Sequence, residues 1–206
     1  MAPVVDLRED CATRWDGTSE HTLAQSLAAP AIACIEAGLV VDEAASGAED
    51  GDQNRLDLAV SIQSIYRQPI ARAFVGAIGD RLGLDQELRD RILTVLHEAL
   101  LNAVLHGHLR LEAGLRDTLG GVEASHELIK KRLASPDHSQ SKVVIKARWS
   151  ADRLLIAVHD NGVGFEPRKS RPEHRGSGRG LLILEAFCDS VSYQDCGRTV
   201  ILGFEL

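Results

Sequence analysis

The middle of the chain reads Val95-Leu-His-Glu-Ala-Leu-Leu-Asn-Ala-Val-Leu-His-Gly107. From Ile92 to Leu105 nearly every position is apolar, so we predict a buried helix there. Glu98 and Asn102 are four residues apart, and this spacing places both side chains on the same side of that helix. A carboxylate and an amide are costly to bury unless a partner satisfies them. A metal ion with phosphate oxygens would satisfy both side chains.

The composition argues against several classes of protein. The chain has 206 residues, 44% of them hydrophobic, which suits one globular domain with a modest extension. Its net charge of −7 leaves no basic footprint for nucleic acid. The sequence contains no run of about 20 apolar residues, which argues against a membrane-spanning helix. The N-terminus lacks a signal pattern and the four cysteines lack CxxC spacing, so we expect a cytoplasmic protein with reduced thiols.

Residues 1–54 differ from the rest of the chain. Acidic and small residues are frequent there, and 44–52 has the composition of a flexible acidic linker. We therefore predict an acidic, partly flexible N-terminal extension over 1–54, with one helix over 21–37 that Pro30 could interrupt. A compact domain is predicted over 55–206, with an insert over 109–141.

Hydrophobic periodicity predicts the elements of the compact domain. Alternation predicts strands, and apolar positions three or four residues apart predict helices. Gly83 and Gly107 are expected to end the two longer helices, and Asp85 to cap the start of the second. The order is a strand over 56–62, helices over 69–82 and 85–106, an inserted helix over 123–133, a hairpin over 142–149 and 153–159, a helix over 180–188 and a hairpin over 190–194 and 199–204. This order predicts an α+β fold, a two-layer α/β sandwich whose mixed, mostly antiparallel sheet has helices on one face.

Two glycine-rich motifs follow the apolar helix. Asp160-Asn-Gly-Val-Gly164 comes directly after an apolar strand, where the carboxylate could accept a hydrogen bond from the amino group of a base. Gly176-Ser-Gly-Arg-Gly-Leu181 opens a helix, whose unpaired N–H groups and positive dipole end suit phosphates. The second motif is neither a Walker loop nor a dinucleotide fingerprint. Taken alone, each motif also fits an ordinary turn.

Taken together, the motifs resemble a known family. The order Glu-x3-Asn, Asp-x-Gly-x-Gly, Gly-x-Gly-x-Gly resembles the N box and the two glycine boxes of the GHKL ATPase superfamily, which has the Bergerat fold. Gly197-Arg-Thr199 fits the closing Gly-Thr element of that family, and the resemblance spans 55–206. The helix ending in His-Gly and the short segment between Gly164 and Gly176 are similar to those of bacterial anti-sigma-factor serine/threonine kinases.

The resemblance implies ATP and Mg²⁺ as cofactors and assigns roles to the motif residues. Asn102 would be the magnesium ligand, and Glu98 the general base for the attacking hydroxyl. A cation at the γ-phosphate would stabilise phosphoryl transfer, and Arg179 is the first candidate, followed by Arg175. The other residues would hold the nucleotide: Asp160 would read the adenine amino group, Gly162 and Gly164 would flank the base, Gly176, Gly178 and Gly180 would surround the phosphates, and Thr199 would support the adenine site.

The implied function is an anti-sigma-type kinase that uses Mg-ATP. It would phosphorylate a serine or threonine of a STAS-type anti-anti-sigma protein and sequester a sigma factor or an analogous regulator. The resemblance also implies a homodimer, with the helix over 69–82 as a candidate interface. Two alternatives stay open: a non-catalytic ATP-binding regulatory module, and a histidine-kinase-like catalytic domain that acts in trans. His97 lies within the nucleotide helix, so we do not expect it to be phosphorylated.

Overall fold

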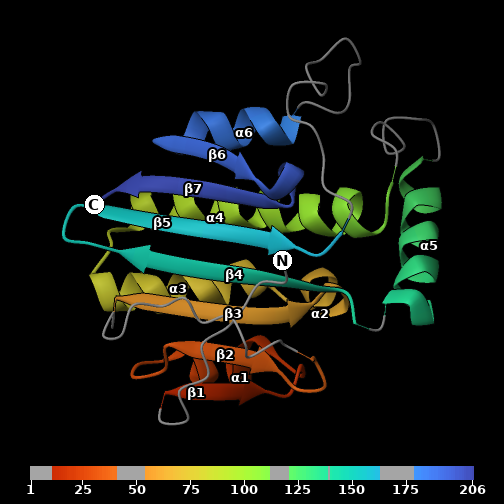
Figure 1. The fold of residues 1–206 in the computed structure, drawn as a ribbon, viewed down its shortest axis with the longest axis horizontal. Helices are drawn as coiled ribbons and strands as arrows, with labels where there is room; N and C mark the ends of the chain where they lie inside the picture. The colour runs from red at the N-terminus through yellow and green to blue at the C-terminus, as the bar shows by residue number, and fades with distance from the viewer. Residues whose placement is uncertain (1–10, 41–53, 112–120, 139, 163–178) are drawn as a thin grey trace.

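A computed structural model describes residues 11–40, 54–111, 121–138, 140–162 and 179–206, with the side chains of 121–125 and 179 left out. The described residues form a mixed sheet with helices packed behind it, which confirms the predicted α+β sandwich (Figure 1).

The sheet has seven strands within the described residues, in the order β1-β2-β3-β4-β5-β7-β6. β1, β2 and β3 are parallel to one another, whereas the remaining neighbours pair antiparallel. Both predicted hairpins are present, as β4–β5 and β6–β7. The strands are β1 (Ala12–Trp15), β2 (Ala33–Glu36), β3 (Arg55–Ser61), β4 (Lys142–Trp149), β5 (Arg153–Asp160), β6 (Ser190–Gln194) and β7 (Thr199–Glu205).

Most of the helices bury their apolar sides against one face of the sheet, whereas α5 (Gly121–Leu133) stands beyond the ends of the strands. None of those in the described part of the chain combines the length and apolar character needed to cross a membrane. Within the described residues, the α-helices are α1 (Glu20–Leu27), α2 (Ile62–Arg67), α3 (Ile70–Leu82), α4 (Gln86–Asn102), α5 (Gly121–Leu133) and α6 (Arg179–Phe187), with a π-helix (Ala103–His108) and 3-10 helices at Pro136–His138 and Asp195–Gly197.

The residues predicted to end α3 and to begin α4 do so, whereas the residue predicted to end α4 does not. Gly83 ends α3 in the left-handed conformation, and the Asp85 carboxylate caps α4 by accepting from the backbone N–H of Leu88. Gly107, however, does not stop the second helix. The chain continues from α4 directly into the π-helix, which places Gly107 inside a helical turn. Pi-helical turns of this kind are often found at functional sites.

The single helix predicted over 21–37 is wrong in its second half. α1 ends at Leu27 with Ala28 in an extended conformation, and residues 33–36 form β2 instead. Pro30 explains the break, because a proline removes a backbone donor and disfavours helical geometry in the residue before it. The run Ala33-Cys-Ile-Glu36 is then free to pair with β1 and β3.

Residues 11–40 are built into the same sheet as the predicted compact domain, although the sequence assigns them to an extension. Trp15, Leu23 and Leu27 are fully buried in the main core. Arg81 of α3 also donates to the carbonyls of Leu27 and Ala31, at 2.7 and 2.6 Å. α1 therefore packs on α3 and covers part of the helix that the sequence proposes as a dimer interface.

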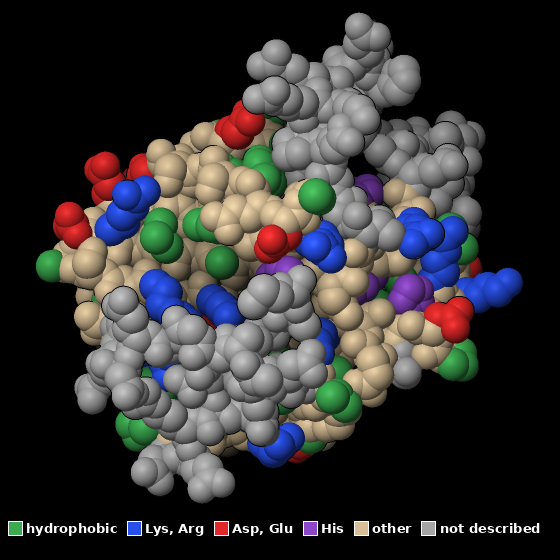
Figure 2. All heavy atoms as spheres, in the orientation of Figure 1, with side chains coloured by type: hydrophobic (Ala, Val, Ile, Leu, Met, Phe, Trp, Pro, Cys, Tyr) green, Lys and Arg blue, Asp and Glu red, His purple; other side chains and the backbone are tan. Residues whose placement is uncertain are grey.

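The other face of the sheet carries charged side chains (Figure 2). Asp57 of β3 is buried there and forms an ion pair with Arg148 of β4, which donates to both carboxylate oxygens. Such a partner offsets the cost of burying the carboxylate. The two faces of the sheet therefore differ, and the apolar face with its helices is the one that leads to the candidate site.

The packing of α1 predicts a stability effect. Replacing the fully buried Leu27 by Ala leaves a cavity and should cost about 2–5 kcal/mol of unfolding free energy. Because residues 11–40 share the core, urea unfolding should shift as one cooperative transition. Val40→Ala is the control, since Val40 is 66% exposed and its truncation should change little. A separate early transition in Leu27→Ala would show that residues 11–40 fold independently.

Candidate functional site

The helix pair α4 and α6 brings Glu98 and Asn102 together with Gly180. A Cβ atom added to Gly180 would strike Oε1 of Glu98 and would lie 3.0 Å from Nδ2 of Asn102. The start of α6 therefore packs directly against both polar side chains of α4. A methyl group at this position would force the Glu98 carboxylate to move, so glycine suits the close approach of the two helices.

The π-helix places Gly107 against the carboxylate of Asp160. A Cβ atom added to Gly107 would lie 2.9–3.0 Å from the three carboxylate atoms of Asp160. Gly162 approaches even more closely, because an added Cβ there would overlap the carbonyl oxygen of Gly107 and lie 2.7 Å from Oδ1 of Asp160. Two glycines and one carboxylate are thus packed at the end of β5 with no room for another side chain.

Asp160 is buried, with 7% of its surface exposed, at the last position of β5. Its carboxylate accepts a hydrogen bond from the backbone N–H of Gly162, at 2.8 Å. Burial raises the pKa of Asp160 to about 6, although the Gly162 N–H and the positive charge of Arg198 act in the opposite direction. A buried carboxylate with spare acceptor capacity suits recognition of an amino group.

Thr199 lies on the other face of the sheet. It pairs in register with His159, and its hydroxyl donates to Oδ2 of Asp195 at 2.9 Å while lying 2.7 Å from Nδ1 of His159. Neighbouring side chains in a strand point to opposite faces, so His159 and Asp160 point apart. The structure therefore brings Thr199 to His159 and Asp195 rather than to the Asp160 carboxylate.

Two residues of the site were not selected from the sequence. Arg198 accepts a hydrogen bond from the backbone N–H of Asp160 through its carbonyl, at 2.9 Å, and its charge lowers the pKa of that carboxyl. For Gly107 the sequence predicts only a helix stop. The contact of Gly107 with Asp160 and the role of Arg198 both depend on tertiary packing, which no local sequence pattern reveals.

Several predicted site residues lie outside what the structure describes. Gly164, Gly176 and Gly178 are not among the described residues, nor is Arg175. The backbone of Arg179 begins α6, but its side chain is not described. The described candidate residues consequently form two groups, which we name by the parts of a nucleotide that the sequence predicts for them: a phosphate end at Gly180, Glu98 and Asn102, and a base end at Asp160, Gly162 and Gly107.

Comparison with known proteins identifies a matching family model and similar proteins. A family model described as the histidine kinase-like ATPase domain matches residues 131–204. An anti-sigma F factor of Clostridium perfringens is 30% identical over 157 residues, which cover 70% of this chain and 89% of the relative. An anti-sigma F factor of Shouchella clausii is 27% identical over 164 residues, covering 74% of this chain and 93% of the relative.

Gly107 provides a test of the base end. In Gly107→Ala the added methyl group displaces the Asp160 carboxylate, so adenosine affinity should fall by about tenfold, the loss of one hydrogen bond to a charged group. Inosine triphosphate lacks the amino group, so the ratio of the affinity for ATP to the affinity for inosine triphosphate should also decrease. Calorimetric titration measures both effects.

Gly76→Ala is the matched control for that variant. Gly76 lies within α3, and an added Cβ there has nothing within 4 Å, so both the fold and the affinity should be retained. Equal adenosine affinities in the two variants would contradict the assignment of the base end.

The raised pKa of Asp160 predicts a pH dependence of binding. An ionised carboxylate accepts from the adenine amino group better than a protonated one, so adenosine affinity should fall as the pH drops through about 6. Adenosine is the probe because it carries no phosphate that titrates in this range. Asp160→Asn keeps an acceptor oxygen without the titration, so its profile should be flat.

The same shift predicts the sign for stability without ligand. The folded state holds this proton more tightly than the unfolded chain, whose pKa is near 3.8. The contribution of Asp160 to stability is therefore fully present below about pH 4 and is lost as the pH rises through about 6. Urea unfolding of the protein and of Asp160→Asn across this range measures the difference; identical pH profiles would contradict the shift.

Proposed function

The chain belongs to the histidine kinase-like ATPases of the GHKL superfamily, in the group of the anti-sigma factors, and on this basis we propose that it is an ATP-dependent protein serine/threonine kinase of anti-sigma type. Its substrate would be a serine or threonine of a STAS-type anti-anti-sigma protein. Its regulatory partner would be a sigma factor or an analogous regulator, as the names of the relatives suggest.

One observation carries the proposal above all. Gly180 at the start of α6 packs against Glu98 and Asn102, so a helix N-terminus, a carboxylate and an amide meet at one point. A helix N-terminus favours phosphate through its free N–H groups and its dipole. The base end, with Asp160 between Gly107 and Gly162, supports an adenine nucleotide at the other end of the same site.

The described residues fit the cofactors that the family implies. The Asn102 amide oxygen suits Mg²⁺, which takes few protein ligands and completes its octahedron with phosphates and water. When bound, the ion would offset the negative charge of the phosphates. Among the described residues no three His, Cys, Asp or Glu side chains gather as a metal site, so phosphate oxygens would supply most of the ligands.

The remaining roles follow from the chemistry of phosphoryl transfer. Glu98, partly buried beside Gly180, would accept the proton of the attacking hydroxyl. Arg179 lies inside the glycine motif, next to Gly180. It would provide a cation for the transferring phosphoryl group. Asp160 would orient the base, which fixes the direction in which the phosphates extend toward α6.

Phosphate transfer tests the proposal. The protein is incubated with labelled ATP and a STAS-type protein encoded beside it, and labelled serine or threonine ester should form. Glu98→Gln should keep ATP binding but lower the transfer rate by about 100-fold or more, as expected when a general base is removed. Asn102→Ala should weaken the magnesium dependence of ATP binding.

The outcomes separate the three candidate functions. ATP binding without transfer, together with intact regulation in Glu98→Gln, would indicate the non-catalytic module. An acid-labile, base-stable phosphate on a partner would indicate a histidine-kinase-like activity in trans. Lack of ATP binding by the unaltered protein would refute all three.

A further inference from the structure

Three polar residues lie along one side of α4: Arg91, Glu98 and Asn102, here named the α4 polar stripe. Glu98 follows Arg91 by seven residues and Asn102 follows it by eleven, or about two and three helical turns, so the three side chains align. α6 runs antiparallel along this stripe. Its first turn meets Glu98 and Asn102 at Gly180, and its last residue, Phe187, meets Arg91.

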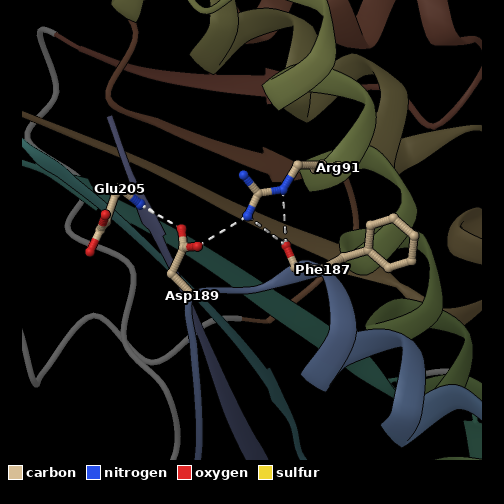
Figure 3. A network of polar contacts seen from close by, with 4 residues as sticks. All are labelled: Arg91, Phe187, Asp189 and Glu205. Atoms are coloured by element: carbon tan, nitrogen blue, oxygen red, sulfur yellow. Dashed lines mark hydrogen bonds and ion pairs between the residues drawn. The ribbon is translucent and has the colours of Figure 1, made fainter.

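Arg91 binds the C-terminal end of α6 (Figure 3). Its Nη2 donates to the carbonyl oxygen of Phe187 at 3.1 Å, and its Nε lies 3.3 Å from the same oxygen. Nη2 also donates to Oδ1 of Asp189, at 3.1 Å. The last carbonyls of a helix lack partners within it and carry the negative end of its dipole, so a guanidinium is favoured there.

Asp189 connects this contact to the sheet. Its second oxygen, Oδ2, accepts from the backbone N–H of Glu205 in β7 at 2.8 Å, and its own N–H donates to the carbonyl of Gly203 at 2.9 Å. The Glu205 N–H, followed by the bond from Arg91, holds the pKa of Asp189 below its usual value. The end of α6 is therefore attached both to α4 and to β7.

We propose that Arg91 is a positioning residue for the phosphate end of the site. By fixing the Phe187 end of α6, it sets how far the helix extends along α4 and hence where Gly180 stands relative to Glu98 and Asn102. Seven residues separate the two contacts on α6 and seven separate Arg91 from Glu98, which is about 10.5 Å along each helix. α4 thus holds both ends of α6 at matching distances.

The positioning of α6 by Arg91 does not depend on the proposed function, but its expected effect on nucleotide binding does. A shift of α6 moves the N–H groups that face phosphate, whereas the base end at Asp160 belongs to β5 and the π-helix. Loss of Arg91 should therefore weaken contacts to phosphates and leave contacts to adenine unchanged. Loss of a residue that only stabilised the fold would weaken the contacts to phosphates and to adenine alike.

The test compares ligands with and without phosphates. In Arg91→Ala, affinity for ATP should fall by about tenfold, while affinity for adenosine should stay within about twofold. Arg91→Lys keeps a cation and a donor and should recover part of the loss for ATP. Calorimetric titrations of the full chain with each ligand give these ratios.

Arg89→Ala is the matched control. Arg89 lies on the same helix and likewise binds one backbone carbonyl and one aspartate. It donates to the carbonyl of Leu84, in the connection between α3 and α4, at 2.9 Å and to Asp80 of α3 at 3.0 Å, so neither bond involves α6. Its loss should lower the melting temperature without changing the ratio of ATP to adenosine affinity.

Hydrogen exchange of the α6 amides, measured without any nucleotide, separates this inference from the proposed function. Exchange in residues 183–187 should be faster in Arg91→Ala than in Arg89→Ala. If ATP fails to bind the unaltered protein but this difference appears, the proposed function fails and Arg91 still positions α6. If α6 exchanges equally in both variants, or if Arg91→Ala changes ATP and adenosine affinity alike, the inference is wrong.

Discussion

Burial of one side of α4 is the constraint on which the rest of the molecule depends. Ile92, Val95 and Leu96 are fully inaccessible to solvent within the main core. Each such side chain contributes about 1.5–3 kcal/mol through burial, so rotating α4 would be costly. Because the apolar side of α4 is held in the core, the orientation of its other side is fixed as well, and the α4 polar stripe faces α6. The polar residues of this helix are therefore oriented by their apolar neighbours.

The two ends of the site are built on different physical principles. At the phosphate end, a helix terminus meets the polar side chains of another helix, and the geometry depends on how two helices are placed along each other. At the base end, two backbone segments approach so closely that only glycine fits at Gly107 and Gly162. The base end is therefore defined by close packing, whereas the helix that forms the phosphate end is held at its other end by the hydrogen bonds of Arg91.

Much of this could be predicted from sequence, for reasons that particular residues make clear. Glu98 and Asn102 share a side of α4 because helical spacing is regular, and β4 and β5 follow from simple alternation. The position of Thr199 is harder to predict, because its pairing with His159 on the neighbouring strand decides which face of the sheet it occupies. β2 was missed because Ala33-Cys-Ile-Glu36 is too short to show a period, and its pairing with β1 and β3 is decided by tertiary contacts. The contact of Arg91 with Phe187 joins residues far apart in the chain, which no local pattern reveals.

The strand–helix–strand unit of residues 12–36 also determines where the sheet ends. Because β2 pairs with β3, the outermost described strands are β1 and β6, of four and five residues. A long, flat outer strand offers a row of unpaired backbone groups to which another chain can add, and short ones limit that risk. With β2 in place, the seven-residue strand β3 is paired on both sides. The N-terminal unit thus protects the protein against edge-to-edge aggregation, independently of anything that happens at the nucleotide site.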